Sequence, residues 1–139
     1  MEIEIQLTNA PISAQLPAPT TGGVGAGAWL EFRGVVRSEE NGAVIAALEY
    51  EAYSPMAEME MRRIIAELAG GQPCLFARVI HRIGIVPVGE AAIYVGIAAR
   101  HRAEAFALLA GFMERLKRDV PIWKRRALVT AELAELKTK

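Results

Sequence analysis

The stretch Ala28–Tyr53, AWLEFRGVVRSEENGAVIAALEYEAY, decides the fold class of this 139-residue chain. Ala28–Arg37 is rich in β-branched and aromatic residues and predicts a strand. Asn41-Gly42 then gives the strongest short-range signal for a β-hairpin, because both residues tolerate a positive φ. Ala43–Tyr53 is expected to return as the partner strand. On it, Glu49 and Glu51 share one face, which a solvated strand edge explains at least as well as acid–base chemistry does.

The segments on either side of this stretch complete an α+β pattern. Upstream, MEIEIQLT alternates acidic and apolar residues with the period of a strand. Downstream, apolar residues recur at helical spacing in two segments with β-rich runs between them, and a third, short helix is expected near the C-terminus. The expected helices are Met56–Leu68, His101–Arg118 and a short one at Ala131–Leu136, and the expected strands are Leu75–Ile83 and Ala91–Ala99. We predict one domain over residues 1–139, with antiparallel or mixed sheets and two main helices.

Composition narrows the class of protein. A hydrophobic content of 53% supports a core, and a formal net charge of zero gives no bias towards nucleic acid or membrane. No apolar run approaches the ~18 residues that span a bilayer, and the N-terminus lacks the basic start and apolar block of a signal peptide. The single cysteine, Cys74, excludes an internal disulfide framework and fits a reducing compartment. We therefore expect a cytoplasmic protein without nucleic-acid or membrane partners.

Three motifs have simpler structural explanations than functional ones. Gly23–Ala28 loosely matches G-x-G-x-x-A, but a proline-rich loop precedes it and a strand pattern follows it, so it lacks the helix that a dinucleotide site needs. Cys74 enters an apolar strand, as a buried free thiol does, and His81 in the same strand is best explained as a structural histidine. Since no Cys, His or carboxylate cluster has metal-ligand spacing, we expect neither a metal nor a cofactor.

A basic cluster lies near the end of the longest predicted helix and just beyond it. It comprises Arg115, Lys117, Arg118, Lys124, Arg125 and Arg126, against one acidic residue, Asp119. Such a cluster on a neutral chain favours a small anionic ligand over a long polyanion. An RNA-binding role is weak, because Trp123 alone would have to supply the aromatic stacking platform.

Lys117 occupies an unusual place on the helix predicted for His101–Arg118. At about 100° per residue, Lys117 falls within an apolar stripe formed by Phe106, Leu109, Ala110, Met113 and Leu116. One interpretation is a lysine that extends to water and complements the helix dipole. The other is a partly desolvated amine suited to proton transfer or covalent chemistry. Geometry alone leaves both open.

Arg102 lies on the same stripe in the first helical turn, where a cation opposes the helix dipole. His101 and Arg102, with the free backbone N–H groups of that turn, form one candidate anion site. A surface pair without function is the alternative.

Taken together, these segments resemble the large, catalytic subunit of molybdopterin synthase, the MoaE-like family. The resemblance spans about residues 27–126 and leaves 127–139 as a divergent tail. The matching segments are Phe32–Arg37, Leu48–Tyr53 with Met56-Ala57, His81–Gly84, Val88–Glu90, His101-Arg102 with Ala105-Phe106, Leu116-Lys117, and Pro121–Lys124.

The resemblance implies an α/β hammerhead-like fold and a homodimer that forms the core of a heterotetramer. Each half is expected to bind a small ubiquitin-like subunit that ends in a Gly-Gly thiocarboxylate. Sulfur from that thiocarboxylate would pass to cyclic pyranopterin monophosphate, giving the dithiolene of molybdopterin in molybdenum cofactor biosynthesis. The partner thus brings the sulfur, and Cys74 is not needed as a carrier.

The resemblance also assigns roles to residues. Lys117 and Lys124 match the catalytic lysines, and they line a substrate pocket together with Arg37, His101 and Arg102. Arg126 is added to this pocket, although the family usually has an acidic residue at that position. The tail, LVTAELAELKTK, also lacks the family's tryptophan-containing segment. Because these departures change the charge balance at Lys124, the alternative is a non-catalytic homologue that binds the ubiquitin-like partner without turnover.

Helix geometry adds one constraint. Arg102 and Lys117 are 15 residues apart, which is roughly 22 Å along the axis at about 1.5 Å per residue. One small pterin cannot contact both from the same helix. A two-fold dimer would bring Arg102 of one chain towards Lys117 of the other. We therefore predict a composite active site at a homodimer interface.

Overall fold

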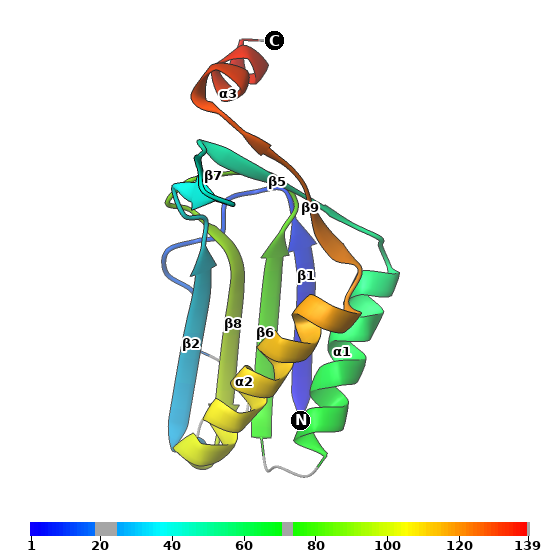
Figure 1. The fold of residues 1–139 in the computed structure, drawn as a ribbon. Helices are drawn as coiled ribbons and strands as arrows, with labels where there is room; N and C mark the ends of the chain where they lie inside the picture. Colours follow the sequence, from blue (N-terminus) through cyan, green and yellow to red (C-terminus); the bar gives the residue numbers. More distant parts are fainter. Residues whose placement is uncertain (19–24, 71–73, 139) are drawn as a thin grey trace.

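The computed structural model describes residues 1–18, 25–70 and 74–138. Its largest sheet has four strands in the order β1-β6-β8-β2 (Figure 1). Strand β1 runs parallel to β6, and the other neighbours are antiparallel. The strands are β1 Glu2–Thr8, β2 Ala28–Val35, β6 Cys74–Arg82 and β8 Ala91–Ala99.

Two helices cover one face of this sheet (Figure 1). Helix α1, Met56–Ala69, packs on β1, and helix α2, Arg102–Asp119, packs on β8 and β2. A short helix α3, Thr130–Lys137, follows near the C-terminus and lies away from the four-stranded sheet. The predicted α+β class and all three helices are confirmed, and no described helix is long and apolar enough to cross a membrane.

A second sheet lies beyond the C-terminal end of β6. Its three antiparallel strands have the order β7-β5-β9, with β7 Gly84–Pro87, β5 Ala47–Ala52 and β9 Ile122–Leu128. The sequence analysis missed β7, which is only four residues long, and β9, whose sequence IWKRRAL is dominated by cations. Arg125 and Arg126 form ion pairs with β5, and Lys124 forms one with Glu40. A search for hydrophobic periodicity does not detect a strand that is stabilised in this way.

The turn at Asn41-Gly42 and the strand before it are confirmed, but the predicted pairing of that strand with Ala43–Tyr53 is wrong. Both residues have a positive φ, 51° and 82°, as a tight hairpin turn requires. The hairpin joins only β3, Glu39–Glu40, to β4, Ala43–Val44. Beyond it the chain separates, because β2 completes the helix-covered sheet beside β8 while β5 enters the second sheet.

This separation also corrects the interpretation of Glu49 and Glu51. Strand β5 is the central strand of its sheet, with β7 on one side and β9 on the other. The two carboxylates therefore do not lie on an edge. They form ion pairs with Arg126 and Arg125 of β9, at 2.8 and 3.4 Å.

The main core lies between the four-stranded sheet and the two helices. Helix α2 contributes Ala105, Leu108 and Phe112, which are all buried. The apolar stripe predicted around Phe106 is therefore not the face that is buried. Phe106 is 56% exposed, whereas Phe112 is only 1% exposed. The buried face is turned by roughly 90° from the predicted one at about 100° per residue. Apolar residues cover more than half of this helix, so periodicity did not determine which part faces the sheet.

The other face of the four-stranded sheet is crossed by the segment after β1. The Arg33 guanidinium donates hydrogen bonds to the carbonyl oxygens of Ser13 and Ala14 at 2.6 and 3.2 Å, and Arg78 donates to that of Pro17 at 2.8 Å. The glycine motif is only partly described, because Gly23 and Val24 lie outside the described residues. Ala28 begins β2, so no helix follows the motif.

The assignment of the buried face of α2 can be tested by substituting its two phenylalanines. Phe112→Ala is expected to lower the free energy of unfolding by about 3–5 kcal/mol, because it leaves a cavity in the core. Phe106→Ala removes the same ring from an exposed site and is expected to cost less than about 1 kcal/mol in the isolated chain. Urea unfolding of both variants measures the difference, and equal losses would contradict the observed phase.

Candidate functional site

A pocket of about 450 Å³ lies where α2 ends between the two sheets. Every element that meets there contributes to its wall. Helix α2 gives Met113, Leu116 and Lys117, strand β9 gives Ile122, Trp123 and Lys124, and the remaining wall is Gly34 and Val35 of β2, Tyr50 of β5, His81 of β6, and Ala92 and Ile93 of β8. We call this site the lysine pocket.

The two lysines reach the pocket from different elements because the chain turns back at Pro121. Lys117 is in the last turn of α2, and Lys124 is the third residue of β9. Strand β9 is held in place by its pairing with β5, where Lys124 lies opposite Tyr50. Both lysine side chains are exposed in the isolated chain, so Lys117 is not enclosed in a core. The pocket therefore presents two ammonium groups beside an apolar wall.

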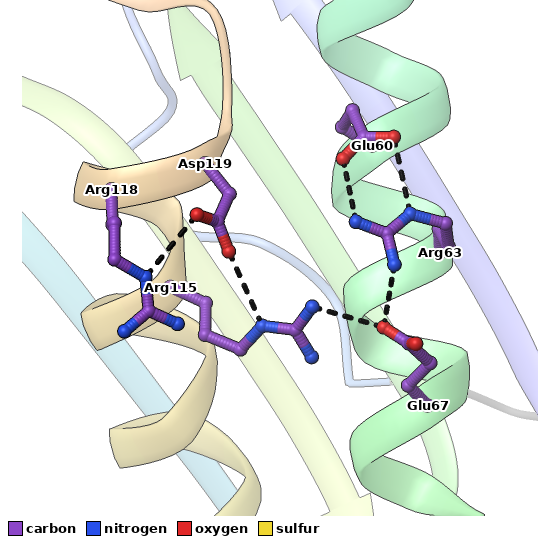
Figure 2. A network of polar contacts seen from close by, with 6 residues as sticks. All are labelled: Glu60, Arg63, Glu67, Arg115, Arg118 and Asp119. Carbon is purple, nitrogen blue, oxygen red and sulfur yellow. Dashed lines mark hydrogen bonds and ion pairs between the residues drawn. The ribbon is translucent and has the colours of Figure 1, made fainter.

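The charge partners of the basic cluster distinguish Lys117 from its neighbours. Arg115 and Arg118 belong to a network that joins α2 to Glu60, Arg63 and Glu67 of α1 (Figure 2). In it, Arg115 lies 3.0 Å from Glu67 and 3.5 Å from Asp119. The Arg118 hydrogen bond is the main reason that the pKa of Asp119 is lowered. Of the six cations of the cluster, Lys117 alone forms no ion pair with any described residue.

Lys124 has a carboxylate partner that the sequence analysis did not anticipate. Its Nζ lies 3.1 Å from Oε1 of Glu40, which belongs to the β3–β4 hairpin. Arg126, two residues further along β9, is engaged with Glu49 instead. Glu40 thus supplies negative charge beside Lys124 from another strand.

Tyr50 and His81 form the polar part of the wall opposite the lysines. Their rings meet edge to face, with centroids 5.4 Å apart. Burial raises the pKa of the Tyr50 hydroxyl, and the charge of Glu40 raises it further. His81 is buried, as expected for a structural histidine, and its Nδ1 lies 2.8 Å from the carbonyl oxygen of Arg82. Burial lowers the pKa of this imidazole, which the hydrogen bond to Arg82 opposes only in part.

The other predicted substrate residues lie elsewhere in the isolated chain. His101 and Arg102 line a separate hollow of about 560 Å³ at the opposite end of α2, together with Gly27, Arg100 and Ala103. Arg37 is exposed after the end of β2 and does not line the lysine pocket, and Arg126 points to Glu49. Of the predicted site residues, the lysine pocket of the isolated chain therefore contains only Lys117 and Lys124.

Two further expectations concern Cys74 and metals. Cys74 is buried, and its pKa is raised first by burial and then by Glu104, so it is a structural thiol rather than an activated nucleophile. Among the described residues, no group of three or more His, Cys, Asp or Glu side chains is placed to hold a metal ion.

Comparison with known proteins identifies the family. The family model described as MoaE protein matches residues 7–119. The chain belongs to the MoaE family. It is 40% identical over 103 residues to the molybdopterin synthase catalytic subunit of Thermoplasma volcanium, covering 74% of this chain and 75% of that protein. It is also 40% identical over 94 residues to the human molybdopterin synthase catalytic subunit, covering 68% of this chain but only 50% of the human protein.

The fold agrees with solved members of the family. Molybdopterin synthase from Staphylococcus aureus superposes with a TM-score of 0.78 at 33% identity, covering 85% of this chain and 86% of that one. The MoaE protein from Burkholderia ambifaria gives a TM-score of 0.73 at 25% identity over the full length of both chains. The resemblance predicted from the sequence is confirmed. The chain spans a third to a half of the length of the human, bovine and Drosophila willistoni relatives.

The buried imidazole predicts a pH dependence of stability. The folded-state pKa of His81 is lowered, so below about pH 6.5 the unfolded chain binds a proton that the folded chain excludes. Stability is therefore expected to fall as the pH drops from 7 towards 5. His81 contributes at most about 1.4 kcal/mol per pH unit.

Urea unfolding at several pH values measures this contribution. His81→Asn is expected to show a shallower fall than the wild type, while the carboxylates contribute equally to both. Identical slopes would mean that His81 takes up its proton in the folded state as readily as in the unfolded one.

Proposed function

We propose that this chain is the catalytic subunit of a molybdopterin synthase. In this role it transfers sulfur from the thiocarboxylated C-terminus of a small ubiquitin-like subunit to cyclic pyranopterin monophosphate, giving the dithiolene of molybdopterin. Family membership and the names of the relatives support the class of activity. The observation that carries the proposal is the lysine pocket, which joins two lysines from separate elements beside an apolar wall.

The chemistry of the pocket suits an anionic heterocycle. The ammonium groups of Lys117 and Lys124 attract the cyclic phosphate and stabilise negative charge that develops during sulfur transfer. Met113, Leu116 and Trp123 provide apolar surface for a planar ring. Because Lys117 forms no ion pair with a described residue, it is available to hold or move a proton at the reacting atoms. The pair Lys124–Glu40 restores the charge balance that Arg126 removes, which favours the enzyme over a homologue without turnover.

The small subunit is the sulfur donor in this proposal, and its extended C-terminus is the part that enters the pocket. An extended Gly-Gly segment is narrow enough to pass between side chains and to place its terminal group beside cations. His101 and Arg102 take part through a second copy of the chain, because they lie at the far end of α2 from Lys117. We place the protein in the cytoplasm, with a homodimer at the centre of the assembly.

Lys117 is expected to be essential for turnover. Lys117→Ala should retain the fold, since the side chain is exposed, and should reduce product formation by more than about 100-fold. The assay uses thiocarboxylated small subunit and cyclic pyranopterin monophosphate. Lys137→Ala, on α3, removes another exposed lysine that does not line the lysine pocket, and it should retain wild-type activity. Partner binding without turnover in the wild type would instead favour the non-catalytic homologue.

The composite site is tested by mixing two inactive variants. Arg102→Ala and Lys117→Ala proteins, allowed to exchange subunits, should recover up to about a quarter of wild-type activity, because about half of the dimers carry one intact site of two. Exchange is checked with differently tagged chains. If exchange is complete and activity stays at the level of the separate variants, both residues serve the same chain's pocket.

A further inference from the structure

The lysine pocket contains a histidine that the proposed chemistry does not yet use. His81 is the penultimate residue of β6 and is only 6% exposed, yet it lines the pocket. Its place in an apolar strand and its burial explain why a sequence pattern classes it as structural. A structural histidine, however, normally has both ring nitrogens paired within the protein.

The hydrogen bonding of His81 fixes its tautomer. Nδ1 lies 2.8 Å from the carbonyl oxygen of Arg82, and a carbonyl oxygen can only accept a hydrogen bond. Nδ1 therefore carries the proton, and Nε2 of the neutral ring presents a lone pair. Among the described residues, Nε2 has no hydrogen-bond partner, and it is not one of the fully enclosed polar atoms. It is an available acceptor at the pocket wall.

The orientation of the ring is fixed as well. The edge-to-face contact with Tyr50 holds one side of the imidazole, and the Arg82 carbonyl holds Nδ1. Arg82 is itself buried, and its guanidinium lies 2.6 Å from Glu90. An acceptor that is held in this way discriminates between ligands, because it does not rotate to suit each one.

The other polar groups of the pocket differ from His81 Nε2 in their hydrogen-bonding capacity. Lys117 and Lys124 are donors only, and Glu40 is paired with Lys124. The Tyr50 hydroxyl either donates or accepts. The two ammonium groups of the pocket thus oppose a further positive charge on His81. A ligand with an anionic group for the lysines and an N–H or O–H donor on its ring satisfies both halves of the pocket.

We propose that His81 is a specificity-determining residue whose Nε2 accepts a hydrogen bond from a ring N–H or O–H of the substrate in the lysine pocket. This rests on the proposed function, in which the substrate is a pterin that carries such donors. The cations then bind the phosphate, and His81 distinguishes the heterocycle from other anions of similar size.

The test measures binding of cyclic pyranopterin monophosphate by calorimetry at two salt concentrations. His81→Asn retains an amide N–H for the Arg82 carbonyl but has no atom at the position of Nε2. It is expected to bind roughly tenfold or more weakly than wild type, as expected for one lost hydrogen bond to a buried acceptor. The loss should be the same at both salt concentrations, whereas the loss in Lys117→Ala should shrink at high salt.

His81→Gln serves as the partial replacement, because its amide oxygen reaches towards the position of Nε2. It is expected to bind more tightly than His81→Asn. Nitrogen-15 NMR of the wild-type imidazole gives an independent measurement that requires no variant. Nδ1 should keep its proton in the free and bound protein, and the Nε2 resonance should move on binding.

The outcomes separate the two proposals. Wild-type affinity in His81→Asn, a loss with the salt dependence of Lys117→Ala, or an unmoved Nε2 resonance in the complex would each overturn the role of His81 and leave the proposed function intact. Failure of the wild type to bind the pterin, with or without the small subunit, would overturn the proposed function and this inference together.

Discussion

The packing of helix α2 on the four-stranded sheet is the constraint on which the site depends. Ala105, Leu108 and Phe112 bury one face of the helix against the sheet. Gly111 permits the close approach of α1, since a Cβ there would meet the Leu68 side chain at 3.2 Å. With the helix fixed along its length, its last turn delivers Lys117 to the junction of the two sheets and its first turn places Arg102 far from it. The packing of α2 therefore determines which of its residues line the lysine pocket and which line the hollow at His101 and Arg102.

Charge compensation then decides which cations remain available. The cluster between Arg115 and Arg126 looks uniformly basic in the sequence, but the fold brings acidic residues to it from three other elements. Glu67 comes from α1, Glu40 from β3, and Glu49 and Glu51 from β5. Such exposed pairs contribute little stability individually. Their effect is on the distribution of charge. Arg115 and Arg118 are engaged with carboxylates (Figure 2), whereas the ammonium of Lys117 forms no ion pair within the part of the chain that the structure describes.

Local patterns of hydrophobicity and β-forming residues predicted the fold class, β1, β2, β6, β8 and the two main helices to within a few residues, and the short α3 was also expected. Strand partners were not predictable in the same way, because the Asn41-Gly42 turn determines a local hairpin and not the sheets that its arms join. For the site, spacing singled out Lys117, and the resemblance added Lys124. Glu40 reaches the site through a contact across 84 residues of chain, and Tyr50 through its pairing with Lys124 and its ring contact with His81, which no local pattern contains. The acceptor role of His81 follows from a bond to the carbonyl of the next residue, which the sequence does not show either. The position of Arg102 relative to Lys117 followed from helix geometry alone.

The pairing of Lys124 with Glu40 has a consequence for how the charge of the pocket can be altered. The two residues are 84 positions apart in the chain, yet the ion pair ties the hairpin to the lysine. Arg126, two residues further along β9, is engaged with Glu49 of β5 instead. Glu40 is not part of the pocket wall, so a substitution there would change the electrostatic surroundings of Lys124 without altering any residue that lines the pocket.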